Sequence, residues 1–89
     1  MIHTEQWTTS IDIEEHEDTT HAVARLRTRD ATALEGRGTA RRNPADRDVP
    51  EIGTELAVAR ALADLQHSLL EATIADIEQA TGEPAHLNR

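Results

Sequence analysis

Three stretches in the first half of the chain alternate between apolar and polar residues with a period of two. In the first, Trp7, Ile11 and Ile13 share one face, which is typical of a half-buried β-strand. The polar stretch 14–19 is expected to form the first turn. The short connections favour an antiparallel meander with strands at about residues 6–13, 20–29 and 33–42. The inward-facing residues of the second and third strands are expected to be Ala22, Ala24, Leu26, Thr28, Leu34, Gly36, Gly38 and Ala40.

From Pro50 onward the apolar residues recur every three or four positions, which is typical of an amphipathic helix. Proline suits the first helical turn, and Asp48 with Glu51 resembles a capping box. Gly82 is expected to end the helical region. A second capping signal at Thr73–Asp76 leaves two alternatives open, one long helix or two consecutive helices. The apolar stripe consists of Ile52, Leu56, Ala59, Leu62, Ala63, Leu69, Leu70, Ile74 and Ile77.

Gly36 and Gly38 fall on the inward face of the third expected strand. A Gly-x-Gly pair at such a place usually marks the close approach of another backbone, here a helix that crosses the sheet. A phosphate-binding loop is disfavoured, because no third glycine follows and no helix begins there. The pattern as a whole predicts an α+β fold. A three-stranded antiparallel meander is followed by one long or two consecutive helices, at about residues 50–81, packed on one face of the sheet within a single domain of residues 1–89.

The composition leaves little material for a hydrophobic core. Leu, Ile, Val and Phe together number 17 of 89 residues, close to the range of disordered chains, although 14 alanines add surface that a helix can bury. The chain has one Trp and no Phe or Tyr. A domain of this size has a thin margin of stability, so we expect the core to take apolar area from a second copy in a homodimer.

Other classes are disfavoured by what the sequence lacks. The absence of cysteine fits a reducing compartment. The segment Met1–Trp7 lacks the features of a signal peptide, and no apolar run approaches the roughly 20 residues that span a bilayer. We therefore expect a soluble cytoplasmic protein with no membrane association.

Charge is distributed unevenly along the chain. Residues 1–24 carry six acids and no base, residues 25–47 carry seven arginines against three acids, and residues 48–89 carry eight acids against two arginines. Every base is Arg, whose planar guanidinium suits phosphate and carboxylate groups. Alternation places most of the central arginines on the open face of the sheet, which predicts an anion- or RNA-binding surface. The set is Arg25, Arg27, Arg29, Arg37, Arg41 and Arg42. The alternative is that these arginines pair with acidic side chains of the protein or of a partner subunit.

Catalytic chemistry is not supported by residue spacing. The five histidines form no pair at helical i, i+4 spacing, and the HExxH motif is absent. Ser10 and Ser68 lie outside any nucleophile-elbow context. The sequence predicts no enzyme, no metal site, no cofactor and no small-molecule substrate.

The connection between sheet and helix carries the most individual stretch of the chain. The string GRGTARRNPADRDVPEIGTELAVARALADL is preceded by W-x-x-x-I-D-I-E-E-H and by A-x-A-R-L. Together these motifs resemble a family of small actinobacterial proteins of unknown function, some of them associated with hypoxic dormancy. The matching signature residues of the connection are Asn43, Pro44, Asp46, Pro50, Glu51 and Gly53. Turn and helix-start chemistry explains most of them.

The resemblance adds expectations of its own. It implies a double-stranded-RNA-binding-domain-like fold of β-β-β-α-α order, often as an intertwined homodimer, and a likeness to ribosome hibernation factors. With the arginine set, it predicts a non-enzymatic stress- or dormancy-associated protein that binds the ribosome, rRNA or other structured RNA. The alternative is a protein-interaction or structural homodimer with no role in nucleic-acid binding.

Overall fold

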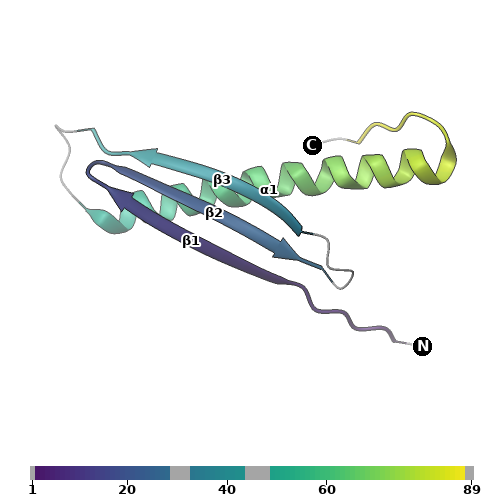
Figure 1. Ribbon diagram of the computed structural model, residues 1–89, viewed down its shortest axis with the longest axis horizontal. Helices are drawn as coiled ribbons and strands as arrows, with labels where there is room; N and C mark the ends of the chain where they lie inside the picture. The colour runs from purple at the N-terminus through teal and green to yellow at the C-terminus, as the bar shows by residue number, and fades with distance from the viewer. Residues whose placement is uncertain (1, 29–32, 44–48, 88–89) are drawn as a thin grey trace.

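The protein consists of a three-stranded sheet with one long helix packed on one of its faces (Figure 1). The computed structural model describes residues 2–28, 33–43 and 49–87. The strands are β1 (Thr8–His16), β2 (Thr19–Arg27) and β3 (Ala33–Arg41), followed by helix α1 (Pro50–Thr81). Both neighbouring pairs in the order β1-β2-β3 are antiparallel, which confirms the predicted meander.

The first hairpin is tighter than the sequence pattern predicted. Strand β1 continues through Glu14 and Glu15 to His16, which pairs with Thr19, so the prediction of a turn from residue 14 was wrong. Polar side chains do not end a strand by themselves, because the strand continues as long as its backbone groups pair with the neighbouring strand. Two residues remain for the turn, and Glu17 adopts a left-handed φ of 55°.

The predicted inward face is confirmed in β2 and β3. In β2, Ala22, Ala24 and Leu26 are buried, and in β3 the buried positions are Gly36, Gly38 and Ala40. Since side chains alternate between faces along a strand, this set defines the side of the sheet that carries α1.

The helix lies against the backbone of β3 at the two glycines. A Cβ atom built on Gly36 would stand 2.3 Å from the carbonyl oxygen of Ala61, and one on Gly38 would stand 2.2 Å from that of Ala57. No side chain fits into such spaces. The predicted close approach of a helix at the Gly-x-Gly pair is confirmed.

The predicted apolar stripe of the helix is not the one that faces the sheet. The buried residues of α1 are Ala57, Ala61 and Leu65. Small residues are required there because the glycines admit the helix backbone so closely. None of the predicted stripe residues is buried, and Ile52, Leu56 and Leu62 are exposed.

The helical region is one continuous helix. Thr73 does not cap a second helix, because its hydroxyl donates to the carbonyl oxygen of Leu69 within the same helix at 2.9 Å. Pro50 occupies the predicted first turn, but the N-cap is Val49, without a side-chain cap, and Asp48 lies outside the described residues. Gly82 ends the helix as predicted, with a left-handed φ of 75°.

Helix α1 covers only part of the sheet. It lies mainly over β2 and β3, and its C-terminal half continues past the end of the sheet, where the chain turns back along it (Figure 1). The buried apolar residues are five alanines and two leucines, and no large side chain among the described residues is fully buried. The larger apolar residues of β1, Ile11 and Ile13, are only partly covered.

Candidate interaction surfaces

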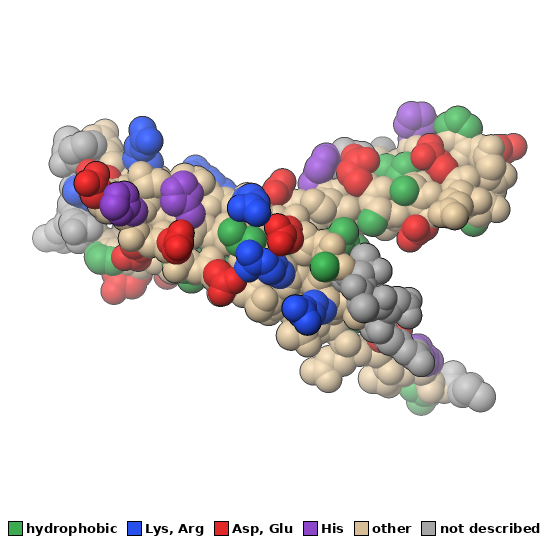
Figure 2. Space-filling view, viewed as in Figure 1, with side chains coloured by type: hydrophobic (Ala, Val, Ile, Leu, Met, Phe, Trp, Pro, Cys, Tyr) green, Lys and Arg blue, Asp and Glu red, His purple; other side chains and the backbone are tan. Residues whose placement is uncertain are grey.

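The predicted arginine face exists on the side of the sheet opposite α1. Strand parity places Arg25, Arg27, Arg37 and Arg41 on this open face. Arg25 is diagonal to Arg37, whereas Arg41 pairs with Thr19 at the opposite end of β2 from Arg27. Arg29 lies outside the described residues. Figure 2 views this face and shows the arginines interleaved with acidic and histidine side chains. The face therefore carries charges of both signs.

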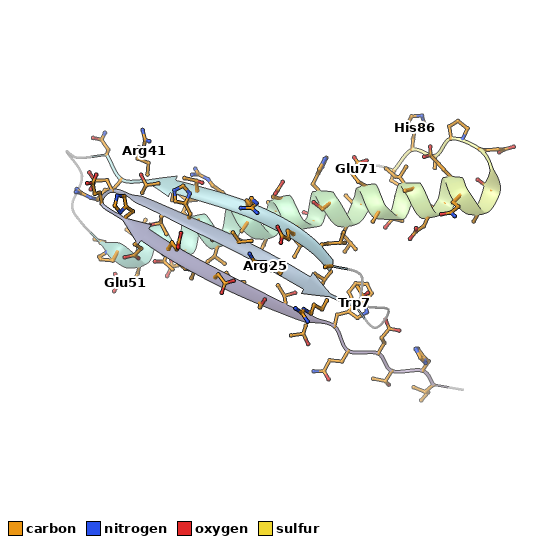
Figure 3. All side chains as sticks on the ribbon, in the orientation of Figure 1. Trp7, Arg25, Arg41, Glu51, Glu71 and His86 are labelled. Atoms are coloured by element: carbon orange, nitrogen blue, oxygen red, sulfur yellow. The ribbon has the colours of Figure 1, made fainter. Side chains whose placement is uncertain are left out.

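Ion pairs neutralise the centre of the open face. Arg25, at the middle of the sheet in Figure 3, bonds to Asp12 of β1 through Nη1 and donates its Nε proton to Glu35 of β3 at 3.1 Å. Glu35 also accepts a bond from Arg37 at 3.2 Å. These ion pairs join all three strands. They agree with the alternative expectation, in which the arginines pair with acidic side chains of the protein.

The remaining arginines behave differently from one another. Arg42 is half-buried at the end of β3, where its side chain bonds to Asp18 at 2.7 Å and its backbone N–H donates to the Asp18 carbonyl at 2.8 Å. It fastens the first hairpin turn to the third strand. Arg27 and Arg41 are exposed, and in the part of the chain that the structure describes they form no ion pair. Among the described arginines of the predicted set, these two are the ones available to an anionic ligand.

The signature residues that the structure describes, Asn43, Pro50, Glu51 and Gly53, lie at the end of β3 and the start of α1. Asn43 follows β3, while Pro44 and Asp46 lie outside the described residues. Pro50 and Gly53 line a shallow cavity of about 220 Å³ between the first hairpin turn and the start of α1. Its wall also includes the acidic side chains Glu15, Glu17 and Asp18, the bases Arg41 and Arg42, and the apolar residues Ile52 and Leu56.

Titratable side chains do not converge elsewhere on the described surface. His21 bonds to Thr39 at 3.1 Å on the open sheet face, and His67 pairs with Glu71 at 3.7 Å on the helix. Within residues 2–28, 33–43 and 49–87, no three His, Cys, Asp or Glu side chains gather closely enough to hold a metal ion.

An apolar surface borders the helix on the side of β1, and the sequence pattern did not predict that it would be open. Trp7, Ile11 and Ile13 are 46%, 37% and 44% exposed. Leu62 is 43% exposed, and helix geometry puts it on the side of α1 opposite Arg60 and Asp64, whose side chains bond to the β3 edge. It therefore lies on the side toward β1. We call Trp7, Ile11, Ile13 and Leu62 the β1 apolar surface. The only earlier signal for it was the scarcity of large core residues.

These features define a small α+β protein. Among the described residues, its candidate binding features are the charged open face of the sheet, the β1 apolar surface and a shallow cavity beside the first hairpin turn. The chain belongs to the Rv2632c-like family, which residues 5–86 match. It is 55% identical over 83 residues to the uncharacterized protein Mb1767 of Mycobacterium bovis, covering 93% of this chain and 87% of that protein. This confirms the predicted membership of an actinobacterial family of unknown function.

A second mycobacterial relative has a solved structure. The uncharacterized protein Rv2632c of Mycobacterium tuberculosis is 49% identical over 72 residues, which cover 81% of this chain and 76% of that protein. The crystal structure of Rv2632c superimposes with a TM-score of 0.83 at 42% identity, covering 93% of this chain and 98% of the other. The three strands and the long helix are therefore the fold of the family. No helix among the described residues is long and apolar enough to cross a membrane.

Proposed function

We propose that this protein is a non-enzymatic, cytoplasmic interaction module that works as a homodimer, with the β1 apolar surface as its contact. The observation that carries the proposal is the contrast between the core and this surface. The core buries alanines and two leucines, whereas the Trp and two isoleucines of the β1 side remain about 40% exposed. Soluble monomers rarely leave their largest apolar side chains grouped and open in this way.

The energetics favour covering this surface. Full burial of an Ile or Trp side chain contributes about 1.5–3 kcal/mol, so the parts still exposed would contribute about 1 kcal/mol each. Trp7, Ile11, Ile13 and Leu62 of two copies together offer several kcal/mol. That amount is significant for a small domain, whose whole stability is about 5–10 kcal/mol.

The electrostatic pattern supports protein contact over nucleic-acid contact. The most central arginine, Arg25, is held by Asp12 and Glu35, and Arg37 shares Glu35. Binding phosphate at these positions would require those ion pairs to break. The net charge of −8 adds a general repulsion toward polyanions.

Light scattering after size-exclusion chromatography tests the proposal. The wild type is expected to elute with a mass of about twice the 9.8 kDa of one chain. Ile13→Glu places a charge in the β1 apolar surface and is expected to give a monomer. Ile77→Glu, at a similarly exposed isoleucine on the overhanging part of α1, is the matched control and should stay dimeric. A monomeric wild type, or a dimer that Ile13→Glu leaves intact, contradicts the proposal.

A second candidate function is the predicted binding of ribosome or structured RNA in stress or dormancy, including the implied likeness to hibernation factors. The specific observation that favours it is that two exposed arginines, Arg27 and Arg41, form no ion pair with any described residue. Such binding would depend on phosphate contacts and weaken steeply as salt rises.

Co-sedimentation with ribosomes at low and moderate salt tests the second candidate. The double variant Arg27→Gln, Arg41→Gln should lose association. A matched control, Gln66→Glu with Gln79→Glu on the exposed helix, lowers the net charge by the same amount and should retain it. Absence of the wild type from the ribosomal fraction at low salt excludes this function.

A further inference from the structure

The two edges of the sheet differ in whether their outward backbone groups are hydrogen-bonded. At β3, three side chains of α1 reach over the outer edge and bond to its backbone. Arg60 donates to the carbonyl oxygen of Thr39 at 2.7 Å, Asp64 accepts the N–H of Arg37 at 2.8 Å, and Ser68 donates to the carbonyl oxygen of Glu35 at 3.2 Å. Proteins protect edge strands in this way, because unpaired backbone groups otherwise attract another strand.

The opposite edge, at β1, has no such protection in the described structure. In β3, the backbone N–H and C=O groups that point away from β2 belong to odd-numbered residues, such as Arg37. The even-numbered residues of β3 therefore bond to the even-numbered residues of β2, and the odd-numbered residues of β2 bond to the even-numbered residues of β1. The odd-numbered residues of β1 are left with backbone groups that point outward. These are Thr9, Ile11, Ile13 and Glu15. No hydrogen bond from any described residue reaches their backbone on the outer side.

Apart from its acidic residues Asp12, Glu14 and Glu15, β1 carries little that discourages the addition of a strand. Its nine residues contain no Pro, Gly or Lys, and they pair with β2 without a bulge from Thr8 to His16. Proline, lysine and β-bulges are features by which edge strands usually avoid pairing, and glycine weakens a strand. The edge is a regular template for an extended chain.

We propose that β1 pairs antiparallel with β1 of a second copy about a two-fold axis at Ile11, which joins the two sheets into one sheet of six strands. This inference rests on the proposed homodimer and specifies its contact. A two-fold interface requires a surface that is complementary to itself. If one residue of the first copy contacts a second residue of the other copy, that second residue of the first copy also contacts the first residue of the other. The register of β1 centred on Ile11 meets this requirement.

In the register centred on Ile11, hydrogen-bonding groups and side chains both match. Ile11 opposes Ile11 of the second copy, and Thr9 opposes its Ile13, so residues with outward backbone groups face each other. On the other face, Ser10 opposes Asp12 and Thr8 opposes Glu14. No acidic side chain opposes another. The next register, centred on Asp12, would oppose two aspartates, which destabilises a strand pair.

The same register accounts for the β1 apolar surface. Ile11 and Ile13 lie on the side of the sheet that carries the helix, on the strand that α1 leaves largely uncovered. Pairing at β1 brings both pairs of isoleucines together in the space between the two helices. Shared backbone bonds and shared apolar burial then act at one contact.

Disulfide trapping tests the register, because the chain contains no cysteine and a single introduced thiol can only join two copies. Residues at a hydrogen-bonded antiparallel position have Cα atoms about 5.5 Å apart, within the range that a disulfide spans. Ile11→Cys is expected to form a covalent dimer readily on mild oxidation. Gln79→Cys on the exposed end of α1 serves as the control for random collision and should remain largely unlinked.

The outcomes separate this inference from the proposed function. If light scattering shows a wild-type dimer but Ile11→Cys does not cross-link faster than Gln79→Cys, the edge pairing is wrong while the homodimer stands. Faster cross-linking of Asp12→Cys than of Ile11→Cys also overturns the proposed register. A monomeric wild type, as expected if the β1 edge accepts a strand of another protein, overturns both proposals.

Discussion

The close contact between α1 and β3 makes Gly38, like Gly36, highly sensitive to a minimal substitution. Gly38→Ala adds one methyl group on the face that the helix covers. Its Cβ would lie 2.2 Å from the carbonyl oxygen of Ala57 and 2.4 Å from the backbone nitrogen of Ala61. Ordinary contact begins near 3.4 Å, so the methyl group is about 1 Å too close to two backbone atoms.

The cost can be estimated from what must move. Backbone atoms cannot rotate away as the end of a side chain can, so the helix must shift from the sheet as a unit. Overpacking of this kind costs about 1–3 kcal/mol, against about 0.4–1 kcal/mol gained because alanine restricts the unfolded chain. A shift of about 1 Å would also strain the bonds of Arg60 and Asp64 to the β3 edge. With the strain on these bonds included, we expect a net loss of about 1–2 kcal/mol.

Equilibrium denaturation in urea and thermal melting followed by circular dichroism measure this loss. A domain of this size should melt about 5–15 °C lower for such a change. Gly53→Ala is the matched control. It lies in the first turns of α1, where a Cβ would meet only the Thr20 hydroxyl at 3.2 Å, and alanine improves helix propensity by about 1 kcal/mol. A Gly38→Ala variant as stable as the wild type would refute the close packing of α1 on β3.

Three further predictions follow from local geometry. Glu17→Gly should raise stability by about 0.5–1 kcal/mol in the same denaturation assay, because Glu17 holds a positive φ that glycine adopts without strain. Gly82→Ala should lower it by about 1 kcal/mol, since φ there is 75°, and an unchanged midpoint would contradict the left-handed helix end. Asp64→Ala should speed hydrogen exchange of the Arg37 amide severalfold, because that amide loses its acceptor, while the Val23 amide in β2 should keep its rate.

Much of the sheet could be predicted from the sequence because its pattern is local. Alternation with a period of two sets which side chains share a face, so the buried sides of β2 and β3 were predicted correctly. The Gly-x-Gly pair on that face likewise predicted the approach of a helix. Strand limits were less accurate, because the acidic residues Glu14 and Glu15 resemble a turn although they continue β1.

The contact side of the helix could not be read from its composition. Apolar residues occur on several sides of α1, and the largest of them formed the more obvious stripe. The distance to the glycines of β3 selects the stripe of Ala57 and Ala61 instead, because only small side chains fit there. That distance is a property of the packed pair and appears in neither segment alone.

The candidate surfaces divide in the same way. The sequence by itself determined that Arg25 and Arg37 share the open face, since parity along a strand is local. The tertiary structure decided that Asp12 and Glu35 neutralise Arg25, because that pairing depends on the register between strands. It also decided that β1 lies open while α1 side chains cover the β3 edge, since the lateral position of one helix over three strands is set by packing.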